Sequence, residues 1–312
     1  LQFDMECCAP EEGMEQAGAD IALLGKHIHA LTHSPEYAAL VGELHADGEG
    51  LSFAQRKTVE HLWERYEKGK NITEEFDHAW SVAANRAYGK WLTAKKASDF
   101  SLFRDSLAEV VDFTRKAIDL RDEKPQGYYN ACLDDTEKGG SEAQMDAFFG
   151  ALKERIVPLM RRIQAEGKPI REDFLTRPCP IPEQERFSHY LLEAEGLRKS
   201  ALVLMTTEHP FTTEFGPHDV RVTTHYFEDN FISNIFSTLH EGGHALFMQN
   251  EPEEFWREHT AGSMTNAMHE CISRFYENII GRSEAFIHFV YPKLQEISGD
   301  FPTSPSGSST RP

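Results

Sequence analysis

Apolar residues recur at helical spacing along most of the chain, so each predicted helix has one apolar face. One of these helices opens with Ser141-Glu142-Ala143-Gln144, which fits a capping box, and its apolar face continues to Ile163. No internal repeat is visible. The predicted helices cover residues 51–70, 74–122 with one or more breaks, 141–163 and 181–204. The pattern therefore predicts a mainly α protein.

One segment departs from helical spacing. Residues 219–226 read DVRVTTHY, with β-branched residues in alternation, and they follow a turn signal at Gly216-Pro217. This pattern predicts a strand. A strand at the edge of a sheet can hold an extended peptide through backbone hydrogen bonds.

A third pattern combines helical periodicity with metal-binding residue types. Ile232, Ile235, Phe236 and Leu239 predict an amphipathic helix that continues into His240-Glu241-Gly242-Gly243-His244. Positions i and i+4 share a helix face, so both imidazoles can bind one metal ion, with Glu241 beside them as general base. A buried helix with two hydrogen-bonded histidines is the alternative, since chance places such a pentapeptide in roughly one chain in fifteen.

The paired glycines in this pentapeptide are unusual inside a helix, where each costs about 1 kcal/mol relative to Ala. A backbone segment that passes close behind the metal would explain Gly242 and Gly243. We therefore expect another element to approach the helix closely at this point.

A second helix is predicted from Met268 to Ile280 and carries Glu270, 26 residues beyond His244. Two His and one carboxylate, with a fourth position open, form a catalytic rather than a structural zinc site. Glu270 is thus the candidate third ligand, and the alternative is a solvated residue paired with Arg274. Cys271 lies on the apolar stripe of this helix, which favours a buried thiol over a sulfur ligand.

Four short motifs occur in order along the second half of the chain: His209-Pro210-Phe211, Asp219-Val220-Arg221-Val222-Thr223, His240 to His244, and His269-Glu270-Cys271. They resemble the HPF, DxRxT, HExxH and HES motifs of the thermostable carboxypeptidase family, peptidase family M32. The resemblance extends over nearly the whole chain, to about Pro302.

The resemblance implies an elongated, helical, gluzincin-like fold with a small β-hairpin or short sheet beside the zinc helix. It implies that His240, His244 and Glu270 bind Zn²⁺, with Co²⁺ also accepted, and that Glu241 is the general base. The implied activity is removal of C-terminal residues from peptides with broad specificity, by homodimers with a deep groove.

Four further residues are candidates for the substrate side of the groove. His209, Asp219, Arg221 and Thr223 belong to the family's HPF and DxRxT motifs. The alternatives are a turn-stabilising role for His209 and a structural contact between Asp219 and Arg221. A carboxypeptidase also needs a cation for the terminal carboxylate of its substrate. In the family this cation is an Arg in a later block, so Arg221 is only a substitute candidate here.

Two departures from the family pattern change the expectation. Cys271 and Ile272 stand where the family usually has Ser and Gln, so a role of that Gln in orienting ligands is missing. The later block with Ile/Val-Arg and Ala-Asp-Glu does not occur in these 312 residues. We therefore expect a partial sequence, with residues 1–302 a partial catalytic domain and 303–312 a disordered tail outside the family.

The amino-acid composition disfavours some classes of binding partner. The chain has 32 Lys and Arg against 51 Asp and Glu, a formal charge of −19, which disfavours nucleic acids and anionic membranes. No apolar run approaches the roughly 18 residues of a membrane helix. The five cysteines suggest neither a disulfide framework nor a Cys-based zinc site, and a cytoplasmic location fits. The second functional hypothesis is a catalytically impaired fragment that binds metal or peptide without efficient turnover.

Overall fold

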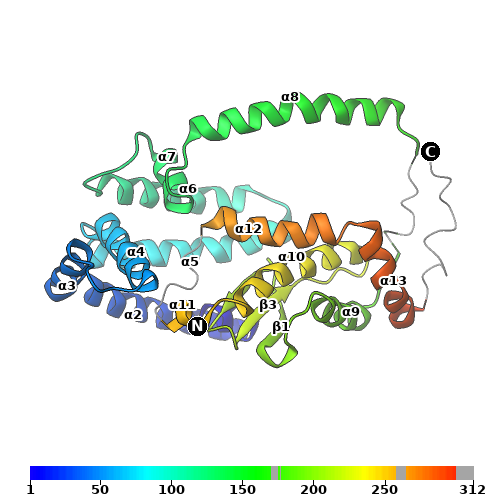
Figure 1. Cartoon of the computed structure of the whole chain (residues 1–312), viewed down its shortest axis with the longest axis horizontal. Helices are drawn as coiled ribbons and strands as arrows, with labels where there is room; N and C mark the ends of the chain where they lie inside the picture. Colours follow the sequence, from blue (N-terminus) through cyan, green and yellow to red (C-terminus); the bar gives the residue numbers. More distant parts are fainter. Residues whose placement is uncertain (170–174, 176, 258–264, 300–312) are drawn as a thin grey trace. The chain divides into compact units, whose positions relative to one another are not determined.

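The computed structural model describes residues 1–169, 175, 177–257 and 265–299 (Figure 1). The chain forms two compact units, one built mainly from residues 1–147 and the other from residues 148–256 and 265–299. The predicted tail at 303–312 lies outside the described residues. Within them, no helix is long and apolar enough to cross a membrane.

The first unit is helical. Ser34, Ser52 and Thr73 each cap a helix by accepting a hydrogen bond from the backbone N–H three residues on, and Ser52 and Gln55 form a complete capping box. These caps explain where three of the helices begin. The helices of this unit are α1 (Gln2–Cys7), α2 (Met14–Thr32), α3 (Pro35–Ala46), α4 (Phe53–Gly69), α5 (Glu74–Ala97), α6 (Ser101–Asp119) and α7 (Tyr128–Thr136), with the 3₁₀ turn η1 (Glu11–Gly13).

The predicted helices 51–70 and 74–122 are confirmed, and the break in the second lies between α5 and α6. Ser98, in the left-handed conformation with φ of 50°, ends α5 there. The predicted helix from Ser141 is confirmed as α8 (Glu142–Glu166), and the Ser141 hydroxyl accepts from the backbone N–H of Gln144 at 3.4 Å.

The second unit carries α9 (Ile181–Ala194), α10 (Phe231–Gln249), α12 (Asn266–Arg274) and α13 (Glu284–Ser298). Its shorter segments are α11 (Glu253–Arg257), the 3₁₀ turn η2 (Lys199–Ala201) and the π-helical turn η3 (Phe275–Ile280), which continues directly from α12. The helix predicted from Met268 to Ile280 is therefore confirmed, with a π-helical end.

A three-stranded sheet lies beside α10 (Figure 1). Its strands are β1 (Leu202–Thr206), β2 (Thr212–Glu214) and β3 (Val220–Thr224), in the spatial order β1-β3-β2. β3 pairs with β1 in parallel and with β2 antiparallel. The strand predicted at 219–226 is thus confirmed, but it is the central strand and offers no free edge to a peptide.

The helix predicted to run from Ile181 to Leu204 is wrong in its second half. α9 ends at Ala194, Gly196 adopts a φ of +96°, and the chain enters β1 at Leu202. Glycine tolerates this backbone conformation at little cost, which explains the end of the helix.

Two apolar clusters hold the second unit together. One joins α9, α10 and α13 through residues such as Phe187, Leu239 and Val290. The other packs β3 against α10 through Val220, Val222 and Ala245. Full burial of a Val, Leu or Phe side chain contributes about 1.5–3 kcal/mol to folding. As a result, α10 is fixed on one side by the sheet and on another by α9.

A buried polar network crosses the same interface. The side-chain oxygen of Asn234 accepts hydrogen bonds from Ser188, Thr224 and Thr238 at 2.8–3.2 Å. These four side chains come from α9, α10 and β3, and each is no more than 1% exposed. Because buried polar groups must find partners, the network allows only one relative position of the three elements.

Candidate metal centre

The HExxH turn of α10 lies against α12, which places three donor side chains together. His240 Nε2 is 3.6 Å from Glu270 Oε2, and His244 Nε2 is 3.9 Å from Glu270 Oε1. One ligand atom from each of the three residues lies within 4.8 Å of the other two. The described residues therefore bring together the three predicted metal ligands from two helices.

The close approach of the two helices depends on Gly243. A Cβ at this position would lie 2.9 Å from Ser273 Cα and 3.3 Å from the Ile272 carbonyl oxygen, both in the backbone of α12. The expectation of a close backbone approach is confirmed for Gly243. At Gly242 the neighbour is a side chain instead, the carboxyl of Glu195.

The face of α12 and η3 that lies against α10 carries the polar residues Ser273 and Glu277. The prediction that the apolar stripe of this helix is buried is therefore wrong. Ser273 and Glu277 are buried there, whereas Met268, Phe275 and Ile279 of the predicted apolar stripe are at least 47% exposed. Cys271 is also exposed, so the predicted buried thiol is wrong. The inward face is the one on which Ser273 lies against Gly243 and Glu277 contacts His240.

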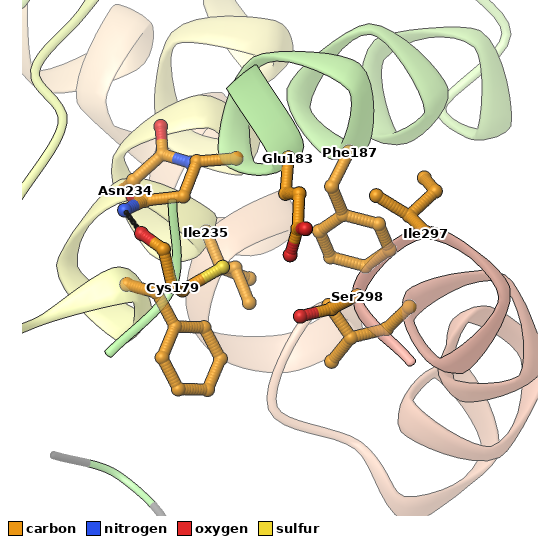
Figure 2. Close-up of a pocket in the computed structure, with 10 residues that line it drawn as sticks. Cys179, Glu183, Phe187, Asn234, Ile235, Ile297 and Ser298 are labelled. Atoms are coloured by element: carbon orange, nitrogen blue, oxygen red, sulfur yellow. Dashed lines mark hydrogen bonds between the residues drawn. The ribbon is translucent and has the colours of Figure 1, made fainter. Parts of the chain in front are cut away.

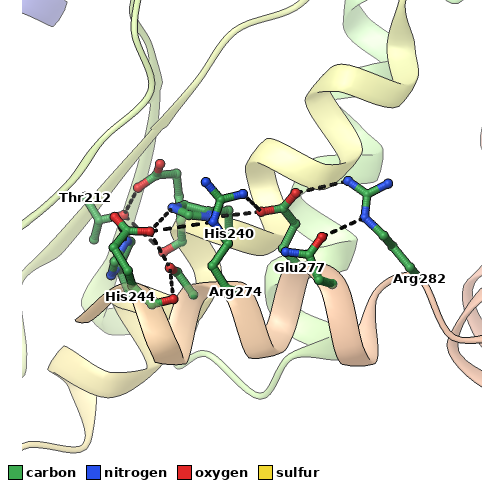
Figure 3. Close-up of polar contacts among 10 residues, drawn as sticks. Thr212, His240, His244, Arg274, Glu277 and Arg282 are labelled. Carbon is green, nitrogen blue, oxygen red and sulfur yellow. Dashed lines mark hydrogen bonds and ion pairs between the residues drawn. The ribbon is translucent and has the colours of Figure 1, made fainter. Parts of the chain in front are cut away.

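Glu277 orients the first histidine (Figure 3). The contact between His240 Nδ1 and Glu277 Oε2 is 3.1 Å, and a carboxylate can only accept. His240 therefore carries its proton on Nδ1 in this contact, which leaves the lone pair of Nε2 for a metal. Carboxylates that fix a metal-binding imidazole in this way are common in zinc sites.

Two arginines keep Glu277 anionic. Arg274 and Arg282 donate to its two oxygens at 2.8 and 3.0 Å. Burial alone would raise the pKa of Glu277, but hydrogen bonds from Arg282 and His240 and the charge of Arg274 outweigh it and hold the pKa below its usual value. Sequence reasoning missed Glu277, although it lies two turns beyond Glu270 between two arginines.

The donor set suits a divalent cation. Burial, together with the neighbouring His240, lowers the pKa of His244 to about 4, so the imidazole is neutral near pH 7. Neutral imidazoles and a carboxylate are the ligand types that zinc prefers. Glu270 is about half exposed, with 52% of its side-chain surface accessible, which leaves one side of the cluster open.

Glu241 lies next to the cluster and is held by the sheet. The Thr212 hydroxyl in β2 lies 2.7 Å from Glu241 Oε2 and 3.0 Å from the Glu241 carbonyl oxygen. Burial raises the pKa of Glu241, and the Thr212 hydrogen bond opposes part of that rise. A carboxyl with a raised pKa is a stronger base when ionised, as a proton acceptor requires.

Two of the candidate substrate residues, His209 in the loop after β1 and Thr223 in β3, differ in their surroundings. The His209 side chain is exposed, and its carbonyl oxygen accepts from Thr207 at 2.8 Å. Thr223 is fully buried, and its hydroxyl lies 2.7 Å from the Phe211 N–H and 3.0 Å from the Thr207 hydroxyl. Thr223 thus ties the His209–Phe211 loop to β3 and presents no surface to a peptide.

The other two candidates form an ion pair with each other. Arg221 Nε and Nη2 each lie 2.9 Å from an oxygen of Asp219, and the guanidinium lies over the Phe215 ring. This bidentate contact is the structural alternative foreseen from the sequence. Neither residue is among the three that cluster as possible metal ligands.

A small cavity lies elsewhere in the second unit, among α9, α10 and α13 (Figure 2). Its lining includes Cys179, Phe187, Asn234 and Ile297, and none of the three candidate ligands. The space is of the order of a single water molecule, too small for a peptide side chain. The cavity is therefore separate from the candidate metal centre.

The helical fold, the short sheet and the two-His, one-Glu cluster together are typical of one class of protein, the metallopeptidases. The family model described as carboxypeptidase Taq (M32) metallopeptidase matches residues 1–308. The chain belongs to this family, as its motifs predicted.

Curated relatives agree with this assignment. Carboxypeptidase 1 of Bacillus subtilis is 34% identical over 300 residues, and thermostable carboxypeptidase 1 of Pyrococcus furiosus is 34% identical over 301 residues. These matches cover 96% and 95% of the chain but only 59% of each relative. The chain thus spans about three-fifths of the length of the relatives it matches.

Solved structures share the fold. The BsuCP crystal structure has a TM-score of 0.87 at 33% identity and covers 95% of this chain and 60% of that one. A Pyrococcus furiosus carboxypeptidase structure has a TM-score of 0.84 at 32% identity, with the same coverage. The mainly α architecture with a small sheet is thus that of M32 carboxypeptidases.

Proposed function

We propose that the chain carries the catalytic centre of a zinc-dependent metallocarboxypeptidase that removes C-terminal residues from peptides. The observation that carries this proposal is the cluster of His240, His244 and Glu270, whose ligand atoms lie within 4.8 Å, with Glu241 adjacent in sequence. Zn²⁺ is the proposed ion because the donors are two imidazoles and one carboxylate, and Co²⁺ prefers similar ligands.

Each residue around the candidate metal centre has its own role in the proposed reaction. A bound metal would supply Lewis acidity, polarising the scissile carbonyl and lowering the pKa of water from about 15.7 toward 7. Glu241 accepts the proton of the attacking water and passes it to the leaving amine. The Thr212 hydroxyl holds the Glu241 carboxylate in place for both transfers. Glu277 keeps His240 in the tautomer that can bind a metal.

We assign the binding of the extended peptide to β2 rather than to β3. The Thr223 N–H donates to the Phe211 carbonyl oxygen, and the Phe215 N–H donates to the Asp219 carbonyl oxygen. The backbone N–H and C=O groups of the odd-numbered residues in 211–215 therefore point toward β3. In an antiparallel pair the alternate residues point their N–H and C=O groups outward. The backbone groups of Thr212 and Glu214 therefore face away from β3, beside Glu241, and can pair with a substrate strand.

Recognition of the terminal carboxylate of a substrate requires a cation that is free to pair with it. Arg221 is paired with Asp219 through two hydrogen bonds, which compensates its charge. We propose that Arg221 and Asp219 shape the sheet and that the carboxylate-binding cation is another residue.

A second candidate function follows from the coverage of the relatives. The chain matches only 59% of each, so the remaining part of each relative has no counterpart in these 312 positions. In this alternative the chain binds metal or peptide without efficient turnover. The homodimeric state, the lack of nucleic-acid partners, the cytoplasmic location and the broad specificity are likewise proposals. The family match extends to residue 308 and so into the expected tail at 303–312.

Metal content and turnover, measured together, test the proposal. We expect about one zinc per chain in the wild type, loss of zinc in Glu270→Ala, and release of the C-terminal residue from an N-blocked dipeptide. Glu296→Gln, an exposed carboxylate paired with Lys293, serves as the control and should retain its zinc. Zinc without turnover would favour the second candidate, and a wild type that binds no zinc would contradict the assignment of the centre.

A further inference from the structure

Glu195 lies directly behind the metal-binding turn. It directly follows the last residue of α9, and its side chain reaches Gly242 in the middle of the HExxH sequence. A Cβ on Gly242 would lie 1.8 Å from Glu195 Oε2 and 2.8 Å from Glu195 Cδ. The carboxyl therefore occupies the space that a side chain at position 242 would need.

The carboxyl of Glu195 is also isolated. Both of its oxygens are buried, and within the described part of the chain neither has a hydrogen-bond partner. Burial raises the pKa of Glu195 well above its usual value, because desolvation penalises the charged form. A buried carboxyl without partners costs folding free energy, and such groups concentrate where function requires them.

The two glycines of the motif face two different neighbours. Gly243 lies against the backbone of α12, which carries Glu270, and Gly242 lies against Glu195. Successive residues of a helix are about 100° apart around its axis, so the two contacts act on different faces of α10. The turn between His240 and His244 is thus held from two directions.

We propose that Glu195 is a positioning residue for the metal site: its carboxyl fills the space over Gly242 and fixes the HExxH turn of α10 against α12. This role rests on the proposed function. The site needs two imidazoles and Glu270 at fixed separations, and metal affinity is sensitive to shifts of the ligand-bearing backbone. Glu195 sets that position through shape, with no hydrogen bond to the ligands.

A steric exchange between the two positions tests the proposal. Gly242→Ala introduces a methyl group that collides with the carboxyl, and Glu195→Ala removes the carboxyl. In the double variant the new methyl group occupies part of the vacated space. Glu195→Gln preserves the shape of the side chain and replaces an acid by an amide.

Zinc affinity by chelator competition is the readout, with the melting temperature of the metal-free protein measured in parallel. We expect Gly242→Ala and Glu195→Ala each to weaken zinc binding about 10-fold or more, and Glu195→Gln to stay within about 3-fold of the wild type. The double variant should bind zinc more tightly than Gly242→Ala alone, as coupled neighbours do.

Three results would overturn the proposal. One is a double variant no better than Gly242→Ala. Another is a set of variants whose melting temperatures fall while zinc affinity stays unchanged, because this shows a purely structural role. The third is a Glu195→Ala protein with wild-type affinity, which decides the question even if Gly242→Ala does not fold. A wild type that binds no zinc would instead overturn the proposed function itself.

Discussion

Replacing Glu277 by Gln tests how the orientation of His240 affects metal binding, without removing a candidate metal ligand. Glu277 accepts from His240 Nδ1 at 3.1 Å and from Arg274 and Arg282 at 2.8 and 3.0 Å. Gln keeps the volume and one acceptor oxygen, but it removes the negative charge. The amide nitrogen would also face one of the two arginines, donor against donor.

The expected loss in zinc affinity follows from these contacts. Partners that orient a metal-binding imidazole are worth about 10–100-fold in metal affinity, or about 1.4–2.7 kcal/mol. The loss of folding free energy without metal should be smaller. Arg274 and Arg282 are 59% and 47% exposed, and such ion pairs contribute about 0.2–1 kcal/mol each.

The assay is competition for zinc with a chromophoric chelator, together with urea unfolding of the metal-free protein. Glu296→Gln is the matched control, since Glu296 is 67% exposed and pairs only with Lys293 among the described contacts. We expect Glu277→Gln to weaken zinc binding by at least about 10-fold and the control to change it by less than about 2-fold. Equal zinc affinity in both variants would refute the orienting role of Glu277.

Three other predictions concern the base, the helix contact and a buried acid. Glu241→Gln should retain zinc and lose at least about 100-fold in turnover, because general-base catalysis contributes about 10²–10⁴-fold. Turnover near the wild-type rate in a dipeptide assay would exclude Glu241 as the base. Gly243→Ala should lower the unfolding free energy by about 1–3 kcal/mol, since its methyl group meets Ser273 Cα at 2.9 Å, and unchanged thermal and urea unfolding would contradict the close packing. Burial and the neighbouring Glu251 raise the pKa of Glu214 to about 7, whereas in the unfolded chain it ionises near about 4.3, so its contribution to stability is lost as pH rises between these values. Glu214→Gln should therefore gain stability relative to the wild type from pH 5 to 8, and a constant difference across that range would rule this out.

The helices and the shared face of His240 and His244 could be predicted because their signals are local. The i, i+4 spacing of His240 and His244 specifies a shared helix face, and the apolar period around Leu239 confirms the helix. The position of Glu270 left open a ligand and a residue paired with Arg274, and the resemblance of His269-Glu270-Cys271 to the family's HES motif selects the ligand. Glycine inside a helix lowers its stability, so the glycine pair predicts a close neighbour, and Gly243 has one in the backbone of α12.

The remaining features depend on contacts between distant segments. Leu202 to Leu204 read as part of a helix because a short apolar run does not distinguish helix from strand, and the parallel pairing with Val220 to Val222 decides it. Cys271 was placed on a buried stripe, but the packing of Ser273 over Gly243 turns the other face inward. Glu195 gave no signal in sequence, because its burial arises only when α9 and α10 pack together.

The most direct test of the metal centre is a crystal structure of the chain with zinc, with data collected on both sides of the zinc absorption edge. The account predicts one strong anomalous peak, about 2.0–2.2 Å from His240 Nε2, His244 Nε2 and a Glu270 oxygen. A peak elsewhere in a fully zinc-loaded crystal, or one that leaves Glu270 out of the coordination sphere, would contradict it.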